Sequence, residues 1–270
     1  MRLGSEESVG EEVQSVARCL RVLKSFTPER PEFGVSELAR LHGVHVSSMS
    51  RLLATMAAQG FLRPGLAEGS YRLGLAVIEL GTFARVTLDV RAVAAPTLWE
   101  LASRTGETVS LAIRSGSEAV VIERAPGSTD AFGYTIWVGR RLPLHASGHG
   151  KALIAFLAPE EQEAQLATMG KRGTLEKYTP RTISTVAELK KDLEEARMRG
   201  YVVSRAELDR YGGGVAAPVF DHEGMLRASI AIPEFDHLLD ARRERVLADH
   251  VLGAAARISE QIGGPMRSRR

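Results

Sequence analysis

Apolar residues near the start of the chain recur at intervals of three and four, which is the spacing of amphipathic helices. The boundaries come from local signals: Pro28 closes the first segment, and Ser36 is placed to cap the second. Gly43 then breaks the second segment, and Gly60 stops the third. The expected helices are Val13 to Phe26, Glu37 to His42 and Val46 to Gln59.

After Gly60 the pattern changes to two short strands around a loop rich in glycine and proline. The strands are expected at Phe61 to Arg63 and at Ser70 to Leu73. A hairpin that directly follows three short helices has the arrangement of a wing. The first part of the chain is therefore expected to be a winged helix-turn-helix, the fold of many DNA-binding domains.

Two apolar helical segments come next. Leu75 to Val86 has few charges and is expected to form a linker helix, while Val90 to Arg104 supplies another helix, interrupted early by Pro96. Helices this apolar need a partner to cover them.

The second half of the chain mixes strands with helices. Its strand-like segments are rich in β-branched or aromatic residues and are bounded by Gly, Pro or Ser. They are Thr108 to Gly116, Glu118 to Pro126, Tyr134 to Gly139, Val215 to Phe220 and Leu226 to Ile232. Helices are expected at Lys151 to Leu157, Ala187 to Arg199 and His237 to Ile262. Hairpins between neighbouring strands predict an antiparallel sheet covered by helices, so the fold class is α+β.

Composition adds broad limits. The chain has 270 residues, 44% hydrophobic and 25% charged, which suits a soluble protein of two domains. Its polar first ten residues do not resemble a signal peptide, and no apolar run is long enough to span a membrane, so we expect a cytoplasmic protein. A net charge of +2 is too small to indicate nucleic-acid binding by itself. Cys19, the only cysteine, is expected to be a buried spectator without disulfide or metal.

The segment from Val35 to Leu62 carries the main functional signal. It has a short helix, a tight turn and a longer helix whose early exposed residues can enter a major groove. These residues can form hydrogen bonds or ion pairs with bases and phosphates: His45, Ser47, Ser48, Ser50 and Arg51, with Ser36 ahead of them. Free N–H groups near Ser47 and Ser48 would add a phosphate anchor. Any bundle of three short helices can show this pattern. The hairpin that follows directly, with Arg63 and Arg72, favours the DNA-binding interpretation. Arg72 either contacts DNA or only solvates the wing.

Several blocks in this order resemble the IclR-type regulators over nearly the whole chain. They are SVARCLRVLKSF with SELARLHGVHVSSMSRLLATM and YRLG, then LASRTGETVSLAI, then RLPLHASGHGKALIAFL, and finally RGYVVSRAE through VAAPVFDHEG. The resemblance implies a winged helix-turn-helix, a linker helix and a GAF-like effector domain, assembled as a homodimer or a dimer of dimers on palindromic operator DNA. The domains then run 13–74, 75–90 and 91–263, between a disordered tail at 1–12 and a basic tail at 264–270.

Enzyme motifs in the second half are incomplete. Ser147 lacks the glycine two places earlier that a nucleophile elbow needs, and Gly150-Lys151 fails as a phosphate loop. His145 and His149 are four apart, but Pro143 and the glycines around them argue for a loop and no acidic third ligand is near. Asp221 to Gly224 is better explained as a solvated hairpin turn, and the run from Gly212 to Gly214 is not a dinucleotide-binding turn. We therefore expect no enzyme activity, no metal and no cofactor.

The HASGHGK segment is instead a candidate anion site. Ser147 can cap a helix that begins near Gly150, and the glycines let backbone N–H groups converge on a carboxylate. The resemblance places the effector pocket here, with a far wall from Ser204 to Val215 and Ala228 to Pro233. The candidate effector-binding residues are Ser147, Gly148, His149, Gly150, Ser204, Glu207, Gly214 and Ala231. Glu207 either holds the pocket's architecture or pairs on the surface.

The chain departs from its family at the far wall and in the recognition helix. Where relatives that bind small keto acids have an acid, a cysteine or serines, this chain has Ser204, Gly214, Ala231 and Pro233. Such a wall favours a larger, more apolar acid, aromatic for example. Tyr211 is either a lid or a packing residue. Val46 and Ser50 replace residues frequent in the family, so the operator sequence cannot be transferred.

The sequence therefore predicts an effector-responsive transcription regulator, expected first as a repressor, of a catabolic or transport operon. It would bind double-stranded DNA and a small organic or aromatic acid, and would not associate with a membrane. The alternative is a small-molecule enzyme or a ligand-binding signalling module with a helical extension. The residues do not distinguish repressor from activator.

Overall fold

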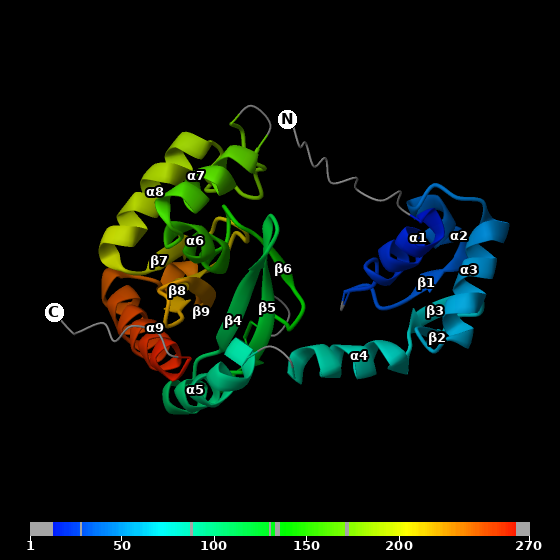
Figure 1. Cartoon of the computed structure of the whole chain (residues 1–270), viewed down its shortest axis with the longest axis horizontal. Coiled ribbons are helices and arrows are strands. Elements are labelled where there is room, and N and C mark those ends of the chain that lie inside the picture. Colours follow the sequence, from blue (N-terminus) through cyan, green and yellow to red (C-terminus); the bar gives the residue numbers. More distant parts are fainter. Residues whose placement is uncertain are drawn as a thin grey trace, which may run out of the picture. The chain divides into compact units, whose positions relative to one another are not determined.

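The computed structural model describes residues 13–27, 29–86, 89–129, 131–132, 136–170 and 173–262. The expected tails at 1–12 and 264–270 lie outside the described residues. The chain divides into two compact units, one up to Ala84 and the other from Arg85 onward (Figure 1). Each unit is described by itself below.

The first unit is a small helical bundle with a three-stranded sheet. Its elements are α1 (Gln14–Leu23), β1 (Phe33–Gly34), α2 (Val35–Leu41), α3 (Val46–Ala58), β2 (Leu62–Pro64) and β3 (Ser70–Leu73). Helix α4 (Leu75–Val86) follows and continues past the boundary between the units. The sheet is antiparallel in the order β1-β3-β2. Leu38, Met49 and Leu53 are fully buried between α2 and α3 because the helical spacing places them on the inner faces. This is the expected winged helix-turn-helix.

Two details of this unit differ from the expectation. Ser36 is not an N-cap, because α2 begins one residue before it at Val35 and takes Gly34 as its cap residue. Gly34 belongs to the short strand β1, which the sequence pattern did not reveal, and that strand fixes where the helix starts. Gly43 and Gly60 do act as breaks, with φ of +64° and +76°, a region that favours glycine.

The second unit is a six-stranded antiparallel sheet with helices on both faces (Figure 1). Its strands are β4 (Val109–Ser115), β5 (Glu118–Ala125), β6 (Arg141–Pro143), β7 (Val202–Arg205), β8 (Gly212–Phe220) and β9 (Leu226–Phe235), in the order β6-β5-β4-β9-β8-β7. Its helices are α5 (Asp89–Thr105), α6 (Gly148–Ala155), α7 (Pro159–Thr168), α8 (Val186–Arg199) and α9 (Ala241–Gln261), with a short 3₁₀ turn at Asp236–Leu238. The α+β class is confirmed.

Alternation along the strands assigns each face of the sheet to a different set of helices. Val215, Ala217 and Val219 of β8 belong to the core that includes α5 and α9, whereas Ala216 between them belongs to the core that includes α6 and α8. Successive side chains of a strand point to opposite faces, so one strand serves both cores. The sheet is therefore buried on both sides, and α6 is held against it.

Some predicted elements were wrong in this unit. Helix α5 continues through Pro96 instead of being interrupted there. Residues 136–139 form no strand, and the edge strand lies a few residues later at β6; Tyr134 and Thr135 lie outside the described residues. Helix α7 and strand β7 were not predicted, and the last helix starts at Ala241. None of the described helices is long and apolar enough to cross a membrane.

Candidate functional site

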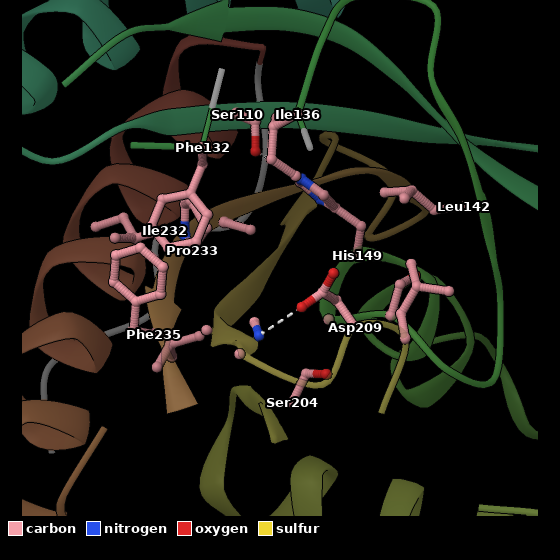
Figure 2. A pocket seen from close by; sticks show the side chains of 18 of the residues that line it. Ser110, Phe132, Ile136, Leu142, His149, Ser204, Asp209, Ile232, Pro233 and Phe235 are labelled. Carbon is pink, nitrogen blue, oxygen red and sulfur yellow. Dashed lines mark hydrogen bonds between the residues drawn. The ribbon is translucent and has the colours of Figure 1, made fainter. Parts of the chain in front are cut away.

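A cavity of about 260 Å³ lies where the N-terminus of α6 meets the ends of β4, β8 and β9 (Figure 2). Its walls are mostly apolar, and Figure 2 shows the rings of Phe132 and Phe235 side by side at one edge. Their ring centroids are 4.8 Å apart. A concave, mostly apolar space with a few polar groups is the usual form of a small-molecule site.

Helix α6 presents its N-terminus to this cavity. The Ser147 hydroxyl accepts the N–H of Gly150 at 3.0 Å and donates to the Pro143 carbonyl at 2.7 Å, so Ser147 is an N-cap as expected. The N–H groups of Gly148 and His149 have no protein acceptor within the described residues. Both residues line the cavity, where these donors and the helix dipole favour an anion.

Ser204 stands beside this helix end. Its Cβ is 3.7 Å from the position that a Cβ on Gly148 would take, and it also lines the cavity. The side chain is buried, with 7% of the residue exposed, and its hydroxyl makes no hydrogen bond to the part of the protein that the structure describes. Ser204 therefore adds an unpaired hydroxyl next to the free N–H groups of α6.

His149 is a neutral, fully enclosed side chain. Burial lowers the pKa of His149 to about 4, partly opposed by a hydrogen bond to the Ser229 backbone. Its Nε2 lies 2.8 Å from the Ser110 hydroxyl and its Nδ1 lies 2.6 Å from the Ser229 hydroxyl. The ring is fixed on both sides, so at neutral pH it supplies shape and polarity to the cavity but no positive charge.

The predicted effector residues separate into two groups. Six line the cavity: Ser147, Gly148, His149, Ser204, Gly214 and Ala231. Gly150 and Glu207 do not. A Cβ on Gly150 would lie 2.4 Å from the Pro143 carbonyl oxygen, so Gly150 allows a close backbone approach, and its N–H is already taken by Ser147. Glu207 pairs with Lys151 at 2.7 Å in the interior, which supports its architectural alternative and not a surface pair.

Sequence reasoning missed several residues of the wall. Ser110 from β4 and Arg140 before β6 line the cavity outside the predicted wall, and Asp209 lines it inside the predicted segment Ser204 to Val215 but was not singled out. The cavity wall therefore contains more polar groups than the sequence suggested. Tyr211 also lines the cavity and is 73% exposed, so it is not a packing residue. No local motif marks these positions, because they meet only when distant strands pair.

The DNA-binding candidates of the first unit lie mainly on the exposed start of α3. His45, Ser47, Ser48, Ser50 and Arg51 are all exposed, as is Ser36 on α2. His45 is the residue before the helix and makes no side-chain cap. The N-terminus of α3 therefore has donors free for a phosphate, next to small polar side chains and one arginine.

Arg72 in the wing is engaged within the protein. Its Nε is 3.6 Å from the carboxylate of Glu32, which also accepts hydrogen bonds from Ser70 and from the backbone N–H groups of Leu66 and Ala67. These contacts, Ser70 first, lower the pKa of Glu32 to about 2. Glu32 thus holds the wing loop in place. The sequence did not predict this role, because Glu32 lies far from the loop along the chain. Arg63, opposite Arg72 in the hairpin, is exposed.

Comparison with family models places both units in one group of proteins. Residues 15–65 match the IclR helix-turn-helix domain, and residues 83–260 match the bacterial transcriptional regulator IclR C-terminal domain. The chain is 33% identical over 250 residues to the transcriptional regulator KipR of Bacillus subtilis, covering 93% of this chain and 97% of that one.

Other relatives carry more specific descriptions. The transcriptional repressor AllR of Escherichia coli is 33% identical over 232 residues, covering 86% of this chain and 84% of the repressor. An IclR homologue from Microbacterium hydrocarbonoxydans, solved with 4-hydroxybenzoate, matches with a TM-score of 0.75 at 27% identity, over 92% of this chain and 98% of that chain. These matching families and relatives are transcriptional regulators and not enzymes.

Proposed function

Because this chain belongs to the IclR family of DNA-binding transcriptional regulators, we propose that it represses a catabolic or transport operon in response to a small organic acid, preferably an aromatic one. The observation that carries the proposal is the free N-terminus of α6, open to a mostly apolar cavity in the effector-binding unit. Its partner is DNA, so we place its action in the cytoplasm.

The acid would bind through its carboxylate. The N–H groups of Gly148 and His149 and the hydroxyl of Ser204 are adjacent donors without protein acceptors in the described chain. Charge-assisted hydrogen bonds to a carboxylate would satisfy all of them. The neighbouring rings of Phe132 and Phe235 offer apolar contact area for an aromatic body. The 4-hydroxybenzoate complex of the relative is consistent with an acid of this kind.

The DNA partner would be a palindromic operator bound by a homodimer or a dimer of dimers. The exposed start of α3, with Ser47, Ser48, Ser50 and Arg51, suits the major groove. One winged unit buries only a small interface on DNA, and two copies on an inverted repeat give adequate specificity. The half-sites are then expected about one helical turn, or a small multiple, apart.

Control of DNA binding by the acid requires that the acid bind two states of the regulator with different affinities. A ligand that bound the DNA-competent and DNA-incompetent forms equally could not change operator occupancy. A coupling of about 1–3 kcal/mol would change the affinity by roughly 5–150-fold. Helix α4 connects the two units along the chain and is the expected carrier of this coupling.

The test is titration of the purified full chain against DNA from upstream of its own gene, with and without a panel of aromatic and aliphatic monocarboxylic acids. Binding to that DNA at two symmetric half-sites, weakened by at least one acid, is the expected result. The proposal is wrong if the DNA is not bound in preference to unrelated DNA. Its effector class is wrong if no acid binds or if acid binding leaves DNA affinity unchanged.

A further inference from the structure

Asp209 places a fixed carboxylate in the wall of the effector cavity. It follows β7 and lies in the segment that leads to β8. Its Oδ1 accepts the backbone N–H of Tyr211 at 2.8 Å and that of Gly212 at 3.1 Å. Figure 2 shows the carboxylate among the labelled side chains that surround the cavity, with a dashed line to a backbone nitrogen. Two hydrogen bonds to one oxygen hold the group in a single orientation.

The second oxygen of Asp209 remains available to a ligand. Oδ2 has no hydrogen-bond or ionic partner within the described part of the chain. Asp209 and Tyr211 are exposed, whereas Ser204 and His149 are buried, so Asp209 lies toward the opening of the cavity. A carboxylate only accepts hydrogen bonds, so this position suits a ligand group that donates one.

The two ends of the cavity therefore have opposite hydrogen-bonding character. At the buried end, Gly148, His149 and Ser204 offer donors to an anion, as argued for the proposed function. At the outer end, Asp209 offers an acceptor and a negative charge. A second carboxylate placed there would be repelled, while a hydroxyl or amino group would be bound.

Among the described residues, the other titratable side chains that line the cavity are those of His149, Arg140 and Tyr211. His149 is neutral because burial holds its pKa at about 4. Arg140 lines the cavity too, and its guanidinium lies over the Trp137 ring, 4.8 Å from the ring centroid. The guanidinium keeps its positive charge over that aromatic face, and the two hydrogen bonds of Asp209 come from the backbone N–H groups of Tyr211 and Gly212.

We propose that Asp209 determines ligand specificity in this cavity by selecting monocarboxylic acids that carry a hydrogen-bond donor, such as a hydroxyl group, away from the carboxylate. The inference rests on the proposed function, because it takes the carboxylate of the acid to bind at α6. It adds that the effector is an aromatic monocarboxylic acid with a hydroxyl or amino substituent and not a dicarboxylate. Asp209 would contact the ligand directly.

The experiment measures the dissociation constants of matched ligands by calorimetry with the full-length protein. The probes are benzoate, 3- and 4-hydroxybenzoate, 3- and 4-methoxybenzoate, and the corresponding benzene dicarboxylates. At least one hydroxybenzoate should bind about fivefold or more tightly than benzoate and than its methoxy counterpart, since only the hydroxyl donates to Asp209. Both dicarboxylates should bind more weakly than benzoate.

The variant Asp209→Asn inverts the hydrogen bonding with little change in shape. The amide oxygen can still accept the N–H groups of Tyr211 and Gly212, while the amide nitrogen turns the outer acceptor into a donor. The preference for hydroxybenzoate should fall to about twofold or less, and the dicarboxylates should gain affinity relative to benzoate. Asp249→Asn, an exposed change of equal charge on α9, should keep the wild-type preferences.

Each outcome decides between the two proposals. The first outcome is that benzoate binds and that adding a hydroxyl, a methoxy group or a second carboxylate does not change the dissociation constant. Asp209 then does not select the ligand, and the acid-sensing role stands. The same holds if Asp209→Asn retains the wild-type order. If none of these aromatic acids binds, the proposed preference for aromatic acids is wrong, and the selectivity inferred for Asp209 is overturned with it.

Discussion

The ammonium group of Lys151 lies 2.7 Å from the carboxylate of Glu207, in the interior of the effector-binding unit. Lys151 is 1% exposed and also contacts Asp192 at 3.0 Å and the Val203 carbonyl at 3.2 Å. The cation thus connects α6 to α8 and to the chain around β7, which forms part of the cavity wall. Removing it would leave the buried carboxylate of Glu207 and the half-buried carboxylate of Asp192 without their shared cation.

We predict that Lys151→Met destabilises the protein by about 3–5 kcal/mol, because it leaves Glu207 as an uncompensated buried charge. Urea unfolding monitored by circular dichroism measures this loss. Lys190→Met is the matched control, since Lys190 pairs with Glu163 on the surface and surface pairs contribute little. Equal stability of the two variants would contradict the prediction.

Gly150→Ala should destabilise the start of α6 by about 2 kcal/mol or more, because its Cβ would lie 2.4 Å from the Pro143 oxygen and 2.5 Å from the Leu144 Cα. Backbone cannot move aside as a flexible side chain can. Gly253→Ala on the exposed side of α9 meets nothing within 4 Å and should stabilise by up to about 1 kcal/mol. The melting temperatures of the two variants separate the effect of the steric clash at Gly150 from the general helix propensity of alanine.

Stability should fall as the pH is lowered from about 6.5 to about 4, because the pKa of His149 drops from its usual 6.5 to about 4 in the folded protein. The unfolded chain binds a proton in this range and the folded chain does not, so the stabilisation present above pH 6.5 is lost toward pH 4. The loss is about 3 kcal/mol for this shift.

His149→Gln should flatten this pH dependence, although it lowers stability at neutral pH by disturbing the contacts with Ser110 and Ser229. The exposed His222→Asn serves as control and should keep the wild-type slope. Urea unfolding at several pH values between 7 and 4 gives the slopes. A wild-type slope in His149→Gln would show that another group controls this pH range.

For DNA binding, Arg51→Ala should reduce the slope of log affinity against log salt by about one unit in each half-site, if Arg51 neutralises a phosphate there. Arg72→Ala should reduce it less, because the charge of Arg72 is already offset by Glu32 at 3.6 Å. Fluorescence anisotropy with operator DNA at several salt concentrations measures both slopes. An unchanged slope in Arg51→Ala would remove this residue from the DNA contacts.

Much of the fold could be read from local patterns. Helix α4 has the bounds that its apolar run predicts, and Ser147 caps α6 as its neighbouring glycines suggest. The helix-turn-helix also follows from spacing, because Met49 and Leu53 lie four residues apart and so share one face of α3. The predictions were wrong where pairing with a distant segment sets the bounds of an element. Strand β1 pairs with β3, so α2 starts at Val35 and Ser36 is not its N-cap residue.

The sequence by itself determined the two-part plan and the helix end that can hold an anion, because spacing and caps act within a few residues of the chain. Tertiary structure decided what surrounds that helix end. Ser110 and Ser229 enclose His149, Ser204 reaches Gly148, and Asp209 enters the wall only because β4, β7, β8 and β9 assemble in one sheet. Contacts between residues tens of positions apart depend on strand order and register, and no local periodicity encodes those.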